Sequence, residues 1–346
     1  MIRDSSSLTP NRQACACLAS SVGFQGVTRE GQTLDWQNEI TQAAERIAPH
    51  IVTTPTVRSK SLNLPYAVEL KFEQMQHTGS FKARGAFNTL LSEDVPEAGL
   101  VAASGGNHGA AVAYAAHQLG HPARIYVPEA AGPSKINLIR QTGADLKVVP
   151  GLYAEALSAA QAWEAKTGAG QVHAYDAVAT IAGQGTLARE WEVQGLEADT
   201  LLIAVGGGGL VAGALAWFGK CKKIVAVEPQ TSCALHSALD HGAPVDVEVS
   251  GIAANALGAK RIGQMCFDLS IKHNVTSVLV SDEEIKQAQE KLWSAHRAYV
   301  EPAGATALAA LLSGAYVPQE GEKLAVLVCG ANVASDPFAS PVQPEA

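Results

Sequence analysis

The sequence predicts an α/β fold in which parallel strands form sheets that are covered by helices on both faces. Short apolar runs alternate with longer amphipathic or alanine-rich segments from residue 99 to residue 328. Two glycine-containing loops, 104–107 and 206–209, stand directly between an apolar run and a helical segment. Strands that are apolar on both faces and separated by helices are typical of parallel sheets.

The first half of the chain begins with residues 1–35, which lack a clear period and are expected to be a loosely ordered extension. An amphipathic helix is predicted at 35–48. Strands are then expected at 67–72, 100–103, 124–127 and 146–149. Helices are expected at 81–91, from the loop 104–107 to 119, from 133 to near 143, and at 153–165.

The second half continues the same alternation. Strands are expected at 201–205, 224–228, 275–280 and 324–328. Helices are expected near 184–194, directly after 209, at 282–297 and at 304–312. Because the pattern contains no internal repeat and no low-complexity linker, the order of strands and helices gives the main information about architecture.

Composition excludes several classes of protein. Of 346 residues, 47% are hydrophobic and 17% charged, which is typical of a globular enzyme and not of a disordered chain. The net charge of -8, without a dense Lys/Arg cluster, argues against a nucleic-acid partner. No apolar run is long enough to span a membrane, and the N-terminus does not resemble a secretory signal.

The cysteines do not form a metal-binding pattern. Their spacing contains no CxxC pair and no histidine partner at metal spacing. The six are Cys15, Cys17, Cys221, Cys233, Cys266 and Cys329. A reduced, cytoplasmic protein is therefore predicted.

The segment 71–86, KFEQMQHTGSFKARGA, contains the candidate reactive residue, Lys82. Lys82 lies in the first turn of a predicted helix, with Ser80 placed to cap that turn. The positive end of the helix dipole and the charge of Arg84 both favour a neutral amine, the form that attacks a carbonyl. The alternative is a solvated surface lysine, which is the usual state of this residue type.

This segment resembles the lysine block of pyridoxal-phosphate (PLP) enzymes of fold type II, in the serine/threonine dehydratase and serine racemase group. The resemblance extends over roughly 45–335 and implies that Lys82 carries the cofactor, with Phe81 beside it. It also implies a tryptophan synthase β-like architecture of two open twisted sheets. The small domain is then expected at 95–176, inserted in a large domain of 1–94 and 177–346, and a homodimer is expected.

The loop Gly206, Gly207, Gly208 and Gly209 is a candidate phosphate site. Glycines allow backbone N–H groups to turn toward an anion, and the following helix N-terminus favours negative charge. A dinucleotide site is the second interpretation, but the GxGxxG fingerprint is missing. A tight turn is the third. The resemblance implies the tetraglycine loop that holds the cofactor phosphate.

The loop Ser104, Gly105, Gly106, Asn107 and His108 resembles the family segment that binds the substrate carboxylate. In the family its asparagine also lies beside the cofactor ring oxygen, which implies this role for Asn107. We expect His108 itself to be structural, because a histidine in a first helical turn is usually packed or solvated.

Cys329 and Glu301 complete the implied cofactor site. Cys329 matches the family residue that faces the pyridine nitrogen. Because a thiol is a weak donor, the nitrogen should stay largely unprotonated, which favours prompt loss of a β-leaving group. A free buried cysteine is the alternative. Glu301 matches a block near the cofactor ring, although Glu before Pro also suits a helix start.

Two departures from the family pattern concern racemisation and metal. Gly105 stands where serine racemases carry the serine that returns a proton from the second face, so elimination is favoured over racemisation. Glu228 and Pro229 match the family's divalent-ion motif, but Ala234 stands where its aspartate would be. No metal site is therefore expected, and Glu228 is expected to be structural.

The resemblance implies a PLP-dependent ammonia-lyase that dehydrates and deaminates L-threonine or L-serine to a 2-oxo acid. The alternatives are a dehydratase of 3-hydroxyaspartate or phenylserine type, a serine racemase, and a non-catalytic PLP-binding regulatory protein. Lys82 argues against the last, because binding alone needs no base. Only a short tail follows Cys329, so a regulatory domain is not expected and a catabolic role is favoured.

Overall fold

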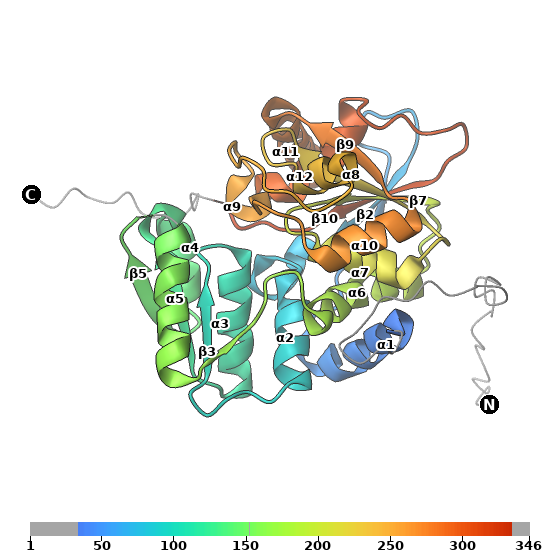
Figure 1. The fold of residues 1–346 in the computed structure, drawn as a ribbon. Helices are drawn as coiled ribbons and strands as arrows, with labels where there is room; N and C mark the ends of the chain where they lie inside the picture. Colours follow the sequence, from blue (N-terminus) through green and yellow to red (C-terminus); the bar gives the residue numbers. More distant parts are fainter. Residues whose placement is uncertain (1–33, 152, 334–346) are drawn as a thin grey trace, which may run out of the picture. The chain divides into compact units, whose positions relative to one another are not determined.

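The computed structural model describes residues 34–151 and 153–333, without the side chains of 130 and 135, and from Asp35 onward they belong to one compact unit. Two sheets organise this unit (Figure 1). The first has six strands, in the order β1 (Thr56–Ser59), β2 (Val68–Phe72), β10 (Leu324–Val328), β7 (Thr200–Ala204), β8 (Lys223–Pro229) and β9 (Thr276–Val280).

All neighbours in this sheet are parallel except β1, which pairs antiparallel with β2. The last strand of the chain, β10, therefore lies inside the sheet, between β2 and β7. The second sheet is entirely parallel. Its strand order is β5 (Asp145–Val149), β4 (Ala123–Pro128), β3 (Leu100–Ala103) and β6 (Gly170–Gln171).

Helices cover both faces of the six-stranded sheet, which confirms the α/β fold class (Figure 1). One face carries α11 (Asp282–His296) and α12 (Pro302–Leu312). The other carries α6 (Val178–Val193) and α7 (Gly209–Phe218), with α1 (Trp36–Ile47) packed on α6 and α10 (Gln264–His273) on α7. The short helices α8 (Ala234–His241) and α9 (Ala254–Leu257) belong to the same part of the chain.

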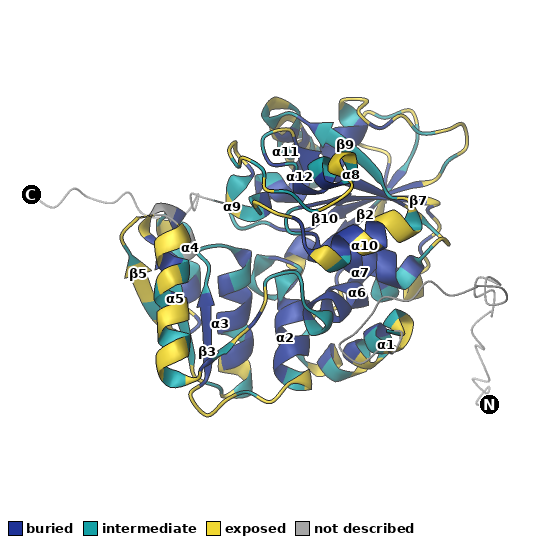
Figure 2. Cartoon of the chain, in the orientation of Figure 1, coloured by how far each residue is buried: buried dark blue, intermediate teal, exposed yellow. Residues whose placement is uncertain are grey.

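The four-stranded sheet packs between α5 (Tyr153–Thr167) and α3 (Asn107–Leu119), and α2 (Lys82–Ser92) packs on α3 (Figure 1). The remaining helix of this part is α4 (Pro133–Arg140). Each sheet has its own hydrophobic core, visible as dark strands and inward helix faces in Figure 2. Ala83, Phe87 and Leu90 of α2 contribute to the core beside the smaller sheet.

The expected helix near 184–194 begins earlier, at Val178. Gly183 and Gly185 have poor helix propensity, but tertiary packing requires both. A Cβ on Gly183 would lie 2.7 Å from the carbonyl oxygen of Arg84, and one on Gly185 would lie 2.5 Å from Ile40. The glycines therefore allow α6 to approach α2 and α1 closely, and this packing outweighs their local preference.

Candidate active site

The predicted reactive and phosphate-binding residues lie around one cavity at the carboxyl ends of parallel strands. This is where ligands bind in open α/β sheets. Its lining combines the lysine block, the glycine loop and the end of β10 with small apolar residues. The lining residues are Phe81, Lys82, Asn107, Ala204, Gly206, Gly207, Gly208, Gly209, Leu210, Ala256, Leu257, Ala303 and Cys329.

Lys82 begins α2, and its ammonium donates to the carbonyl of Ala174 at 2.6 Å. Burial in the cavity lowers the pKa of Lys82 to about 8, while the nearby Cys329 opposes this shift. The direction agrees with the sequence prediction, but the physical cause differs. Desolvation of the ammonium lowers the pKa, and Arg84 is not among the causes.

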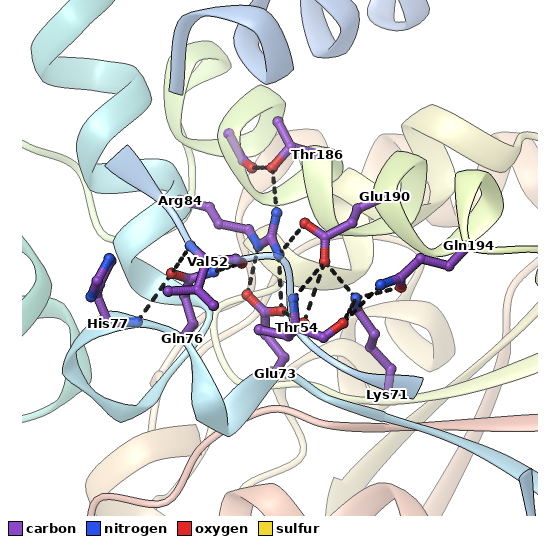
Figure 3. Close-up of polar contacts among 11 residues, drawn as sticks. Val52, Thr54, Lys71, Glu73, Gln76, His77, Arg84, Thr186, Glu190 and Gln194 are labelled. Atoms are coloured by element: carbon purple, nitrogen blue, oxygen red, sulfur yellow. Dashed lines mark hydrogen bonds and ion pairs between the residues drawn. The ribbon is translucent and has the colours of Figure 1, made fainter. Parts of the chain in front are cut away.

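Arg84 does not act on Lys82 because two carboxylates neutralise it within the protein (Figure 3). Its Nε and Nη2 donate to Glu73 at 2.6 and 3.1 Å, and Nη2 also donates to Glu190 at 2.8 Å. Its Nη1 donates to Thr186 at 3.3 Å. Although burial disfavours its charge, Glu73 and Glu190 together raise the pKa of Arg84 above its ordinary value.

Lys71 completes this buried network from β2 (Figure 3). Its three ammonium protons are directed at Glu190, Gln194 and the carbonyl of Thr54, at 2.5, 2.7 and 2.8 Å. Two cations and two carboxylates thus form a neutral cluster, which we call the four-charge network (Lys71, Glu73, Arg84 and Glu190). It joins β2, α2 and α6, and three of its members (Lys71, Glu73 and Arg84) belong to the lysine block itself.

The prediction that Ser80 caps the helix of Lys82 is wrong. The N-cap residue is Phe81, which makes no side-chain cap. Ser80 is instead extended and pairs with Gly330 in an isolated β-bridge, and the Phe81 N–H donates to the Cys329 carbonyl. The Ser80 hydroxyl is buried, with no hydrogen-bond partner among the described residues. Ser80 therefore pairs with the segment that follows β10 and does not cap α2.

The lowered pKa of Lys82 gives a direct test. In the cofactor-free protein, acetylation of Lys82 should be half-maximal near pH 8, because the pKa is about 8 and only the neutral amine reacts. An exposed lysine ordinarily titrates near about 10.4. Acetylation at a series of pH values, quantified by peptide mass spectrometry, measures this difference, with the exposed Lys286 as internal reference. A midpoint for Lys82 above pH 10 would contradict the role of burial.

The glycine loop leads from β7 into α7 and presents its backbone to the cavity. Gly208 has a φ of +95°, which a residue with a side chain rarely adopts. A Cβ on Gly207 would lie 2.2 Å from the ring of Tyr175. The N–H groups of 206–209 donate no hydrogen bond within the described part of the chain. Together with the α7 N-terminus, these groups form a site for an anion.

The loop 104–108 is only partly directed at the cavity. Asn107 lines the cavity from the start of α3, and its Nδ2 donates to Glu301 at 2.5 Å. The Ser104 hydroxyl accepts from the Gly106 N–H at 3.2 Å, within its own loop. A Cβ on Gly105 would lie 2.3 Å from Ala131. Of this loop, Asn107 alone is among the lining residues described above.

His108 is held by the backbone and stays neutral. Its Nε2 donates to the Val172 carbonyl at 2.9 Å. Burial, followed by the charge of Lys82, lowers the pKa of His108 to about 3. Through this hydrogen bond, His108 holds the loop 104–108 against the segment that contains Val172.

Cys329 lines the cavity directly after β10, and Glu301 lies against Asn107. The buried Cys329 thiol donates to the Ala303 carbonyl at 3.3 Å, and burial raises its pKa far above the usual range, with Glu301 adding to the shift. It therefore stays a protonated thiol. Glu301 is buried immediately before α12 (Pro302–Leu312) and faces Asn107, not its own helix N-terminus.

Glu228 caps a helix. Its two carboxylate oxygens accept the N–H groups of Leu235 and His236, both at 2.8 Å, at the start of α8. Burial raises the pKa of Glu228 to about 7, although the two hydrogen bonds oppose the shift. Within 34–151 and 153–333, no group of three or more His, Cys, Asp or Glu residues is placed to hold a metal ion.

Three residues of the site were not found from the sequence. Ala174 accepts the hydrogen bond of the Lys82 ammonium with its backbone carbonyl, so its side chain gives no information about this contact in the sequence. Tyr175 packs against the glycine loop. The only sequence feature related to this contact is the glycine at Gly207, where a side chain would collide with the Tyr175 ring. Asn332 donates to Asn107 at 2.8 Å and belongs to the segment CGAN after the last strand, where its amide could have been singled out.

Comparisons with known proteins identify the class of this site. A family model described as pyridoxal-phosphate dependent enzyme matches residues 47–330. The phenylserine dehydratase of Ralstonia pickettii is 35% identical over 278 residues, which cover 79% of this chain and 85% of that protein. The biosynthetic L-threonine dehydratase IlvA of Haemophilus influenzae is 35% identical over 309 residues, which cover 86% of this chain but only 60% of that protein.

Solved structures agree with this classification. Maize serine racemase superimposes with a TM-score of 0.81 at 31% identity, covering 86% of this chain and 93% of that one. The threonine deaminase of T.th. gives a TM-score of 0.79 at 33% identity, covering 87% and 99%. The fold is thus that of the fold type II PLP enzymes. The chain belongs to the family of pyridoxal-phosphate-dependent enzymes.

The residues of the cavity fit pyridoxal phosphate. Lys82 supplies a primary amine for the aldehyde. The N–H groups of the glycine loop, which have no acceptor among the described residues, suit a phosphate monoester, and the absence of Cβ atoms allows that loop to pack closely against Tyr175. Ala204, Leu257 and Ala303 add apolar side chains to the lining, which suits an aromatic ring. PLP is therefore the cofactor of this enzyme.

Proposed function

We propose that this enzyme eliminates water and then ammonia from a β-hydroxy amino acid, with L-threonine or L-serine as the preferred substrate. The observation that carries the proposal is the placement of Lys82, an amine with a pKa of about 8, in the same cavity as the glycine loop, whose N–H groups donate to no other described residue. A general base works best when its pKa lies near the operating pH.

The side chains around the cavity have distinct tasks in this reaction. Bound PLP supplies the electron sink that makes the Cα proton of an attached amino acid acidic. Lys82 takes this proton at Nζ. The N–H groups of Gly206 to Gly209 would hold the phosphate of the bound cofactor and so keep it in the cavity that Lys82 also lines. Cys329 remains a thiol, and next to the ring nitrogen of a bound cofactor it would be a weak donor that leaves this nitrogen largely unprotonated.

Elimination is favoured over racemisation because Gly105 stands where the serine racemases that this chain resembles carry the serine that returns a proton from the second face. Gly105 has no side chain, and a Cβ there would lie 2.3 Å from Ala131. Any residue larger than glycine would require Ala131 to move. Without a proton donor on that face, loss of the β-hydroxyl is the faster outcome. We keep the alternative of a bulkier substrate, because the phenylserine dehydratase matches this chain over 85% of its length.

We also propose four properties of this protein from its family resemblance and its composition. These are a homodimer, a cytoplasmic location, a catabolic role and the assignment of 95–176 to an inserted small domain. The strands of the four-stranded sheet lie between Leu100 and Gln171, which is compatible with that assignment. No helix in the described residues has the length and apolar character needed to cross a membrane.

Release of 2-oxo acid from a panel of amino acids tests the proposed reaction. The panel contains L-serine, L-threonine, threo-3-hydroxyaspartate and phenylserine, each with the PLP-loaded enzyme. We expect the highest kcat/KM with L-threonine or L-serine, and chiral analysis of the same mixtures should show no D-amino acid. Absence of oxo acid from all four substrates, despite bound cofactor, would refute the dehydratase assignment. A higher kcat/KM with phenylserine would support the bulkier substrate.

A further inference from the structure

Asn332 links the lysine block to the loop that contains Asn107. It follows β10 in the segment 329–332, and its Nδ2 donates two hydrogen bonds. One goes to the backbone carbonyl of Thr78, at 2.7 Å, and the other to the Oδ1 of Asn107, at 2.8 Å. Neither the motifs nor the proposed reaction assign a task to this residue.

The Thr78 carbonyl determines which way both amides face. A carbonyl only accepts, so the Asn332 amide must present its NH₂ group to Thr78. The same NH₂ group also faces Asn107, which must accept this hydrogen bond with its Oδ1 oxygen. The NH₂ group of Asn107 is consequently directed to the other side, toward Glu301 at 2.5 Å. The backbone of the lysine block thus sets the orientation of the Asn107 amide through one side chain.

The position of Asn332 is itself fixed by backbone pairing. The Ala331 N–H donates to the Gly79 carbonyl at 2.9 Å, and the Phe81 N–H donates to the Cys329 carbonyl at 3.3 Å. Gly79 has a φ of +72°, and a Cβ there would lie 2.7 Å from the Asn332 oxygen. The segment after β10 is therefore held along the lysine block, with the Asn332 amide packed against a position that admits only glycine.

We propose that Asn332 is a positioning residue that fixes the amide of Asn107, so that Asn107 offers a donor and not an acceptor to the cofactor. This inference rests on the proposed role of Asn107 beside the cofactor ring oxygen. Because Thr78 is four residues before Lys82, the same contact also ties the orientation of Asn107 to the short 3-10 helix His77–Gly79 that precedes the helix of Lys82.

A double-mutant cycle on cofactor binding tests the proposal. The variants are Asn332→Ala, Asn107→Ala and the double variant, and the measurement is the equilibrium dissociation constant of PLP from absorbance titration. If Asn332 acts through Asn107, Asn332→Ala should weaken binding roughly five- to tenfold in the wild-type background and have almost no effect when Asn107 is already alanine. Equal weakening in both backgrounds would overturn the proposal, because it indicates a general effect on the loop.

A second variant tests the donor directly. Asn332→Asp keeps the shape but places an acceptor against the Thr78 carbonyl and the Asn107 oxygen, so PLP should bind roughly tenfold to a hundredfold more weakly. The matched control is Asn137→Asp on the exposed surface of α4, which adds the same charge. If Asn332→Asp binds PLP as tightly as the control, the proposal is wrong. Both tests measure PLP binding and not turnover. They therefore test the role of Asn332 even if the enzyme turns over no amino acid of the panel.

Discussion

Lys82→Ala should abolish the release of 2-oxo acid while leaving the protein folded. The variant removes both the amine that attaches the cofactor and the base that takes the Cα proton. General acid–base groups alone contribute roughly 10²–10⁴-fold to rate, so we expect a loss of at least this size. The loss should appear in kcat, measured at saturating PLP and substrate, because the glycine loop still holds the phosphate.

Lys82→Arg separates charge from basicity. Arginine keeps a positive side chain at this place but does not lose its proton, since its pKa lies above about 12. We expect it to be as inactive as Lys82→Ala. Addition of methylamine should partly restore turnover in Lys82→Ala, where the cavity has room, and not in Lys82→Arg. Turnover in either variant above a tenth of the wild-type rate, without added amine, would show that another group is the base.

Glu73→Gln should destabilise the protein strongly, because it leaves Arg84 in the interior with one carboxylate fewer. Both side chains are completely buried, and the Nε of Arg84 lies 2.6 Å from the Glu73 carboxylate. Removing one partner of a buried ion pair typically costs about 3–5 kcal/mol of unfolding free energy. Urea unfolding of the cofactor-free protein measures this loss without interference from PLP binding.

The control for this prediction removes both partners. The double variant Glu73→Leu with Arg84→Met leaves Lys71 and Glu190 as a neutral pair, so no uncompensated charge remains. Replacing a buried ion pair by apolar residues of similar volume is often neutral in stability. We therefore expect the double variant to be more stable than Glu73→Gln. If Glu73→Gln loses less than about 1 kcal/mol, the four-charge network is not a coupled unit.

The fold class was predictable from the sequence because its signal is local. Apolar runs such as 324–328 coincide with strands, and the glycines of 206–209 lead from β7 into the first residue of α7 as expected. The helices α8 and α10 were not predicted. They lie within 229–274. The strands on either side of this segment, β8 and β9, were predicted, but the helices between them were not.

The chemistry of the site was harder to predict because it depends on distant segments. Lys82 was recognised from its neighbours in sequence, and the direction of its pKa shift was correct. The predicted cause, the charge of Arg84, was wrong. One of the carboxylates that neutralise Arg84, that of Glu190, comes from α6, more than a hundred residues later in the sequence. Ser80 was misassigned for the same reason, since its partner Gly330 lies beyond the last strand.

The place of β10 in the six-stranded sheet has a consequence for biosynthesis. Because β10 lies between β2 and β7, the sheet cannot close until residue 328 has been synthesised. Until then β2 and β7 have unpaired edges, which are sites of non-native pairing. Such long-range pairing also makes folding slow. Synthesis must therefore have passed residue 328 before Lys82 meets the segment that pairs with the lysine block, and a chain shortened before β10 would lack a central strand.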